Sequence, residues 1–289
     1  MLKELPEKRY VTAFDSLIDL RQVEPDRKRN RNILSDDPGG AGFGSDWWGP
    51  GIKSRDDVNR ALDSGWKDGA DQMVKANEGL ELNLRVARPR RKRVRARIGD
   101  TLDIQRVWQG DLDRAWAATE MGEAMLPLKH VCIALELNGN GFREGKDFMW
   151  RGAAALALAD LIAESGRMVK IMMYGVTKEA YRNKDAHVYT VQVKDYTEPL
   201  DIERLAAAAC MAGTYRHAVW KVRESRPDVA VSSGYGQSLH GKWKGLPNID
   251  PDAEHVIWAC DLWNSREARR WVEENVAKLK EAEDAEDGQ

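Results

Sequence analysis

Three segments between residues 130 and 174 decide the fold: HVCIALEL (130–137), FMWRGAAALALADLIAES (148–165) and MVKIMMY (168–174). The first and the last are short apolar runs, which are typical of strands buried on both faces. The middle segment is apolar almost all round, as a buried helix is, and Gly166 follows it at a position where glycine commonly ends a helix. Strand, helix and strand in this order predict a right-handed βαβ unit with parallel strands.

The alternation of strands and helices continues toward the C-terminus. Apolar runs predict strands at 188–193, 217–222 and 256–262, and apolar periodicity predicts helices at 201–212 and 265–280. Residues 128–280 are therefore expected to form an α/β domain, a mainly parallel, Rossmann-like sheet sandwiched by helices. Residues 281–289 hold five acids and no base, which predicts a disordered tail.

The first 127 residues are expected to form an irregular α+β region. An amphipathic pattern predicts a short helix within 1–22, and a second helix is predicted over 54–76, capped by Ser54 and weakened at Gly65. A Gly-rich loop lies between them and contains Trp47 and Trp48, which either pin it to the core or form a binding lip. A second Gly-rich loop, 232–246, places His240 and Trp243 in a second candidate binding loop.

The charge of the chain is distributed unevenly. The net charge is −2, from 45 basic and 47 acidic residues, which argues against a chain coated in positive charge for nucleic acid. Residues 85–98 nevertheless concentrate basic side chains in a pattern that alternates with apolar residues, as in a half-exposed strand. Two interpretations stay open: arginines paired with acids elsewhere, or a phosphate-binding surface. The candidate nucleic-acid-binding residues are Arg88, Arg90, Arg91, Lys92, Arg93, Arg95 and Arg97.

A candidate ligand site follows from the predicted sheet. In open parallel sheets ligands bind at the carboxyl ends of the strands. The strand 130–137 leads into Glu136-x-Asn138-x-Asn140, and the last strand ends in Asp261, which is expected at the same edge of the sheet. Thr197, which precedes the helix predicted at 201–212, is expected to supply a hydroxyl there. These oxygen-bearing residues form a candidate site for a hard divalent cation such as Mg²⁺.

The order of these elements resembles a von Willebrand factor A-type domain, over residues 128–280. The resemblance covers a buried strand, an acidic loop, a long Ala-rich helix, a second strand and a late strand that ends in Asp. It implies that Glu136, Asn138 and Asn140 stand where the family has Asp-x-Ser-x-Ser, with Thr197 and Asp261 as further ligands. The three loop residues all depart from that pattern, so the resemblance implies a degenerate cation site.

A second resemblance covers most of the chain. The strings SDWWG, VWQGDLDRAW, RGAAALALADLIAESGRMVKI and VKDYTEPLDIERLA are similar to an uncharacterised family of bacteriophage and prophage proteins. This resemblance implies a source but no activity.

Motifs for catalysis are scarce in the sequence. It has no G-x-S-x-G elbow, no P-loop and no zinc spacing among its five histidines. For a metal-dependent hydrolase the sequence offers acidic residues but no clear base or nucleophile. We therefore expect a non-enzymatic binding or scaffold protein that recognises a protein partner through strand-end loops. The alternative is a nucleic-acid-binding protein that uses Arg85–Arg97. No secretory or membrane-spanning segment is evident, so we expect a cytoplasmic location, the host cytoplasm if the chain is phage-encoded.

Overall fold

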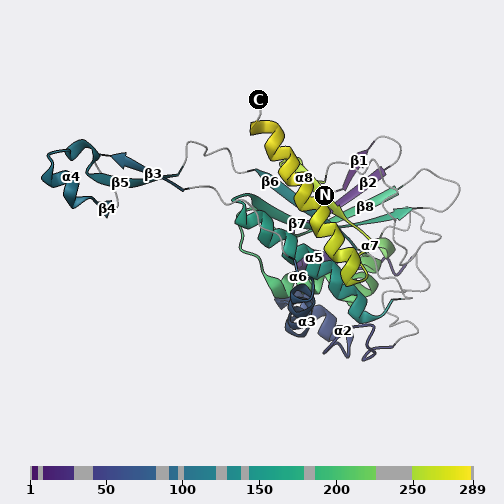
Figure 1. Cartoon of the computed structure of the whole chain (residues 1–289). Coiled ribbons are helices and arrows are strands. Elements are labelled where there is room, and N and C mark those ends of the chain that lie inside the picture. Colours follow the sequence, from purple (N-terminus) through teal and green to yellow (C-terminus); the bar gives the residue numbers. More distant parts are fainter. Residues whose placement is uncertain are drawn as a thin grey trace.

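The structure, a computed structural model, describes residues 2–5, 9–28, 42–82, 91–96, 101–121, 129–137, 143–178, 186–225 and 249–287. Within these ranges the chain has a mixed α/β fold, with a mainly parallel six-stranded sheet flanked by helices and a separate three-stranded sheet (Figure 1). The predicted α/β class is confirmed.

The larger sheet has the strand order β1-β2-β8-β7-β6-β9. The pairs β2–β8, β6–β7 and β6–β9 are parallel, whereas β1–β2 and β7–β8 are antiparallel. The strands are β1 (Leu2–Leu5), β2 (Arg9–Phe14), β6 (His130–Glu136), β7 (Met168–Lys178), β8 (Ala186–Lys194) and β9 (His255–Ala259).

Strand β6 is buried on both faces, as its apolar sequence predicts. Ile133 and Leu135 belong to the large core that the sheet shares with the helices, whereas Ala134 belongs to a smaller cluster with Tyr174 and Val188. An antiparallel strand with one wet face would alternate apolar and polar residues, and β6 does not. Strand β6 is therefore an interior strand, between β7 and β9, and is covered on both faces.

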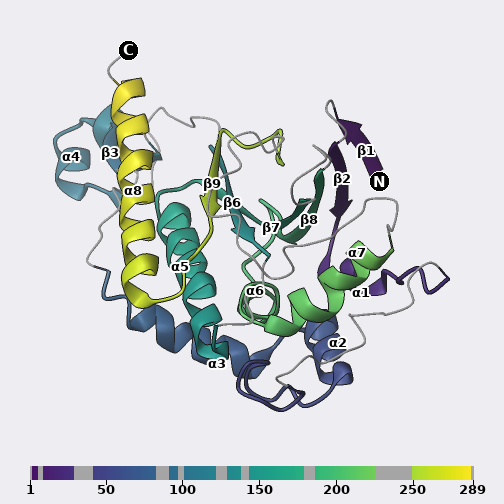
Figure 2. The same cartoon turned by 90° about the vertical axis from the view of Figure 1, so that its right-hand side faces the viewer.

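The helices pack on the sheet and on one another. Helix α5 lies against β6 and β7, with α8, α3 and α6 around it, and Figure 2 shows α5 and α8 side by side. The alanines of α5 allow this crowding, because a short side chain lets neighbouring elements approach closely. The helices are α1 (Leu17–Gln22), α2 (Arg55–Ser64), α3 (Lys67–Glu78), α5 (Gly145–Glu164), α6 (Ile202–Ala209), α7 (Trp220–Glu224) and α8 (Ser265–Asp287).

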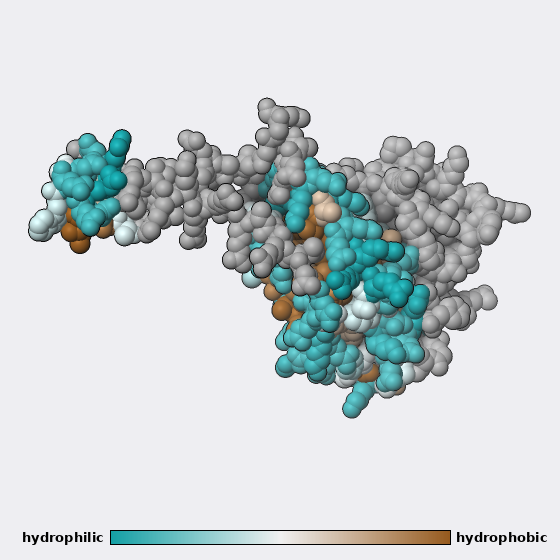
Figure 3. All heavy atoms as spheres, in the orientation of Figure 1, coloured by the Kyte–Doolittle hydropathy of each residue, from teal (hydrophilic) through white to brown (hydrophobic). Residues whose placement is uncertain are grey.

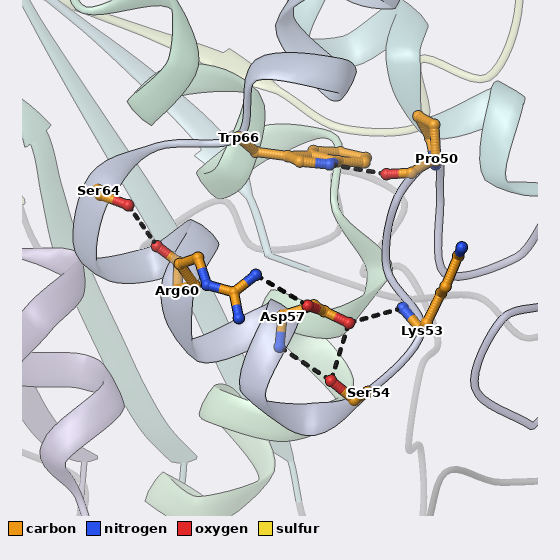
Figure 4. Close-up of polar contacts among 7 residues, drawn as sticks. All are labelled: Pro50, Lys53, Ser54, Asp57, Arg60, Ser64 and Trp66. Atoms are coloured by element: carbon orange, nitrogen blue, oxygen red, sulfur yellow. Dashed lines mark hydrogen bonds and ion pairs between the residues drawn. The ribbon is translucent and has the colours of Figure 1, made fainter.

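The segment between the first Gly-rich loop and α3 confirms two local predictions. Ser54 caps α2 by accepting a hydrogen bond from the Asp57 amide, and Gly65, with φ 94°, separates α2 from α3 (Figure 4). The Ser54 hydroxyl and the Lys53 amide hold the pKa of Asp57 below its usual value. The Trp66 indole donates to the Pro50 carbonyl over 2.9 Å, so the loop is fastened to the start of α3.

Residues before 128 contribute to the same sheet and core as the residues after it. Strand β2 pairs with β8, and buried side chains such as Leu17, Trp48 and Met73 share the large core with Ile133. The expected α/β unit 128–280 is therefore completed by the N-terminal segment.

The short helix predicted within 1–22 is confirmed as α1, and β1 and β2, which the sequence did not predict, precede it because β2 pairs with β8. Two local predictions are wrong. Residues 217–222 are not a strand but part of a π-helix, η3 (Thr214–Val219), and of α7, because burial on all sides removes the periodicity that would separate strand from helix. Residues 281–287 are the last part of α8 and not a disordered tail, which fits the helix propensity of Ala and Glu.

The three-stranded sheet has the order β3-β5-β4 and stands away from the six-stranded sheet in Figure 1. Strand β3 confirms the strand predicted in the basic segment. Two short helices, α4 and the 3₁₀ helix η2, complete this part of the chain, which we call the arm. Its elements are β3 (Arg91–Ala96), β4 (Thr101–Leu102), α4 (Ile104–Trp108), η2 (Leu112–Arg114) and β5 (Trp116–Met121).

Candidate functional site

The carboxyl ends of β6, β7 and β9 meet at one edge of the sheet, because these three strands are parallel to one another. Glu136 is the last residue of β6 and pairs with Tyr174 of β7, and Asp261 follows the end of β9. Glu136 and Asp261 therefore lie at the same edge, as the sequence predicts. We call this edge, with the side chains that line it, the carboxyl edge.

Arg151 of α5 is the charged centre of the carboxyl edge. Its side chain is buried, and its Nε and Nη2 atoms donate to the Ala209 carbonyl over 2.9 and 2.6 Å, while Nη1 donates to the Glu136 carbonyl. One guanidinium thus ties the end of β6 to the end of α6. Five rigid N–H donors make arginine suited to such a junction.

The electrostatics of this group reflect its burial. Burial lowers the pKa of the Arg151 guanidinium, and Cys210, Glu136, Tyr174 and Asp261 oppose that shift in this order. Arg151 therefore lies within electrostatic reach of both carboxylates. It supplies positive charge near two acids, which is the role that a bound cation would otherwise have. Burial and Glu136 also raise the pKa of the Tyr174 hydroxyl, so this side chain is neutral.

Asp261 has an unusual backbone conformation. Its φ is 55°, in the left-handed region, and its Oδ1 accepts a hydrogen bond from the Trp263 indole over 3.2 Å. Asp tolerates this conformation better than most residues, but it remains uncommon outside glycine. Strained residues of this kind concentrate at functional sites, so Asp261 marks this loop as a candidate.

Aromatic side chains extend the carboxyl edge toward the first Gly-rich loop. Phe148 packs edge-on against Trp263, with ring centroids 5.6 Å apart, and against Trp47 at 6.4 Å. The exposed Arg143 places its guanidinium 5.1 Å from the centroid of a Trp263 ring. Arginine and aromatic residues on a rigid base are the types enriched at the energetic centres of protein interfaces.

Trp47 and Trp48 pack inward. Trp48 is only 1% exposed and lies 4.5 Å from Phe43 between ring centroids, while Trp47 is half-buried. The backbone at Asp46 closely approaches Gly145 at the start of α5, where only a glycine fits. Of the two interpretations of this loop, pinning to the core describes Trp48, and Trp47 joins the aromatic cluster of the carboxyl edge. His240 and Trp243 lie outside the described residues.

The placement of Thr197 at the carboxyl edge is wrong. Strand β8 runs antiparallel to β7, with Lys194 opposite Ile171, so residues that follow β8 lie at the opposite edge of the sheet. The sequence pattern showed a strand at 188–193 but not its direction. Helix α6 then returns the chain to the carboxyl edge, and Thr214 follows that helix. Thr214 is buried, and its hydroxyl donates to the Ala207 carbonyl.

The cation ligands predicted from the sequence are only partly placed. Asn138 and Asn140 lie outside the described residues, and Thr197 is excluded. Within the part of the chain that the structure describes, no three His, Cys, Asp or Glu side chains are grouped so that they could hold a metal ion.

The opposite edge of the sheet carries a polar cluster that the sequence did not reveal. Tyr196 donates to Asp250 over 2.6 Å and stacks on His130 with ring centroids 4.2 Å apart, and the Lys170 ammonium lies 3.7 Å from Asp250. Asp250 is 1% exposed. Because its carboxylate has a donor and a cation beside it, the cluster satisfies a buried charge and fastens the loop before β9.

The sequence analysis did not single out Arg151 as a site residue. Asp160, which interrupts the apolar run of α5, lies on the exposed side of that helix. Arg151 is the buried charge in that helix. The available signal was an arginine inside an otherwise apolar helix, where an uncompensated charge would be costly.

The arm holds the basic segment. Arg91, Lys92, Arg93 and Arg95 belong to β3, whereas Arg88, Arg90 and Arg97 lie outside the described residues. The arm also exposes large apolar side chains, and Figure 3 shows apolar residues gathered on its lower side. The exposed side chains are Leu102, Ile104, Trp108 and Leu112, of which Trp108 is 88% exposed.

One family model matches this chain, over residues 3–283, and its description is "Domain of unknown function (DUF7192)". No curated protein matches, and no solved structure matches. None of the helices in the described ranges is long and apolar enough to span a bilayer.

Proposed function

The chain belongs to the DUF7192 family, a domain of unknown function, and we propose that it is a non-enzymatic binding or scaffold protein that recognises a protein partner through its carboxyl edge. The observation that carries the proposal is Asp261, which is held in a left-handed conformation beside Trp263 and within reach of buried Arg151. Rigid, pre-organised contact groups bind with a smaller entropic cost than mobile ones.

The source and the finer fold belong to this proposal as well. The succession of β6, α5, β7 and a late strand that leads into Asp261 supports the resemblance to a von Willebrand factor A-type core. Similarity to phage and prophage proteins supports a phage-encoded chain that acts in the host cytoplasm.

Capture of a partner from a host lysate tests the protein-binding proposal. The lysate is treated with nuclease, and proteins retained by the wild-type chain are compared with those retained by Arg143→Ala and by Asp261→Gly. The glycine keeps the left-handed backbone while it removes the carboxylate. We expect a specific partner to be lost from both variants.

Two control variants keep the test specific. Thr197→Ala alters an exposed residue at the opposite edge of the sheet, and Asp160→Asn removes an exposed carboxylate from α5. Both should retain the partner. A partner that all four variants retain equally would contradict recognition through the carboxyl edge.

A divalent cation such as Mg²⁺ is a second component of the proposal, with Glu136 and Asp261 as its acidic ligands. A cation would have to compete with the Arg151 guanidinium, so we expect only a small rise in melting temperature with Mg²⁺ over EDTA. Asp261→Asn should abolish that rise. An unchanged melting temperature in the wild type would remove the cation from the proposal and leave partner binding intact.

A further inference from the structure

The three-stranded sheet of the arm has two chemically different faces. Residues two apart in a strand share a face, and directly paired residues share it too. The pairs Arg91–Met121, Arg93–Thr119 and Arg95–Ala117 therefore lie on one face, to which Thr101 belongs through its pairing with Ala117. We call this the arginine face.

The other face carries Val94, Trp116 and Leu102 together with one pair of opposite charges. Its pairs are Lys92–Glu120, Val94–Ala118 and Ala96–Trp116, with Leu102 opposite Trp116. Lys92 thus has an acid at the position directly opposite it in the register, and opposite charges at such positions stabilise a strand pair.

The arginine face differs because the cross-strand neighbours of its three arginines are uncharged. Alternate residues of a strand are about 6.8 Å apart, so the three arginine positions recur at a regular spacing on one face of β3. Like charges in a row repel one another, and a polyanion laid along them would remove that repulsion. Guanidinium groups bind phosphate through two parallel hydrogen bonds, which makes arginine the residue of choice for a phosphate backbone.

The arm also has the position that a polyanion needs. Its strands make their main contacts, among the described elements, with one another and with η2, and the arm stands away from the six-stranded sheet (Figure 1). The six-stranded sheet therefore leaves the arm uncovered in this view (Figure 1).

We propose that the arginine face of the arm binds the sugar–phosphate backbone of a nucleic acid. The contacts are to phosphates, so binding is independent of base sequence. This site is separate from the carboxyl edge and does not depend on the function proposed for that edge.

Salt-dependent binding of the full-length chain to labelled oligonucleotides tests the proposal. Fluorescence anisotropy is measured with mixed-sequence single-stranded and duplex DNA. Three phosphate contacts predict a slope of log K against log salt of about −2.7 for duplex and about −2.1 for single strands. Affinity should then fall about 40-fold and about 20-fold, respectively, between 50 and 200 mM salt. Binding of either form supports the proposal, and the comparison shows which form the face prefers.

Two triple variants separate the arginine face from the net charge of the arm. Arg91→Gln/Arg93→Gln/Arg95→Gln should abolish the salt-dependent binding. Lys92→Gln/Arg106→Gln/Arg114→Gln removes the same charge from the arm but none from the face, and should retain most of the affinity. Arg106 already pairs with Asp111 over 2.8 Å, so its charge is partly compensated.

A single variant keeps the test decisive if the first triple variant does not fold. Arg93→Gln removes the central arginine and should lower the salt slope for duplex by about 1 while binding persists. The proposal is overturned if the wild type binds neither form at 50 mM salt, or if the two triple variants weaken binding equally. Binding of an acidic protein without binding of DNA would also overturn it.

Discussion

The six-stranded sheet and the arm are both built from strands with helices beside them, yet their apolar residues differ in burial. In the larger sheet, β6 and α5 bury most of their side chains, and Ile133 and Leu158 are wholly inaccessible. In the arm, Ile104 is 64% exposed and Trp108 is 88% exposed. Secondary structure alone does not decide burial, because a strand or helix hides its apolar side only when a second layer covers it. The comparison indicates that packing holds the large sheet together and that backbone pairing holds the arm.

The sharpest test of this comparison replaces one isoleucine in each region. Ile133→Ala in β6 creates a cavity in the core and should cost about 2–5 kcal/mol in the free energy of unfolding. Ile104→Ala removes an exposed side chain from α4 and should change it by less than about 0.5 kcal/mol. Urea unfolding followed by far-UV circular dichroism measures both. Equal losses in the two variants would break the comparison.

A second pair tests the charged part of the larger region. Arg151→Met leaves the buried Glu136 and Ala209 carbonyls without their donor, and each buried acceptor left unsatisfied costs about 1–3 kcal/mol. Arg143→Met should lower the free energy of unfolding much less, because the Arg143 guanidinium is exposed and lies over the Trp263 ring. The same urea experiment compares them. A fully stable Arg151→Met protein would show that this junction does not hold the carboxyl edge.

Alkaline pH should weaken the larger region specifically. Burial raises the pKa of the Cys132 and Cys210 thiols to about 12 from an ordinary value of 9.0. The folded state therefore holds these protons more tightly than the unfolded state, and stability is lost as pH rises from about 9 toward 12. The slope approaches about 1.4 kcal/mol per pH unit for each thiol. Urea unfolding at pH 8 to 10.5 should show this loss, with a shallower slope for Cys132→Ala.

The smallest expected effect concerns Trp108. Because its side chain is almost fully exposed, Trp108→Ala should change the free energy of unfolding by less than about 0.5 kcal/mol. The variant should also lose the tryptophan fluorescence that acrylamide quenches most readily. A marked fall in stability would mean that the exposed side chain contributes to the fold, contrary to the comparison.

The elements of the larger region were largely predictable from the sequence. The apolar runs at 130–137 and 168–174 and the helix between them correspond to β6, β7 and α5, since strong, long apolar patterns leave few alternatives. The cap at Ser54 and the break at Gly65 were also predictable, because each depends on the chemistry of one residue. The strand predicted at 217–222 was wrong because this short run is buried on all sides. Its apolar residues therefore show neither the helical nor the strand period.

The candidate sites were less predictable. Glu136 and Asp261 follow parallel strands, and the rule for such sheets placed them at one edge. Thr197 was misplaced because β8 is antiparallel, and strand direction leaves no mark on local composition. Arg151 was missed because its partners, the Glu136 and Ala209 carbonyls, belong to backbone that comes from other parts of the chain.

By itself the sequence determined the α/β class, most of the element positions, the charge of the basic segment and the family to which the chain belongs. These properties depend on side-chain patterns within a few turns of helix or one strand. Only the tertiary structure decided the direction of β8, the addition of β2 to the sheet, the junction at Arg151 and the pairing of β3 with β5 in the arm. Those features depend on pairing and register between distant segments, which are fixed by the sum of many contacts and not by any one stretch of residues.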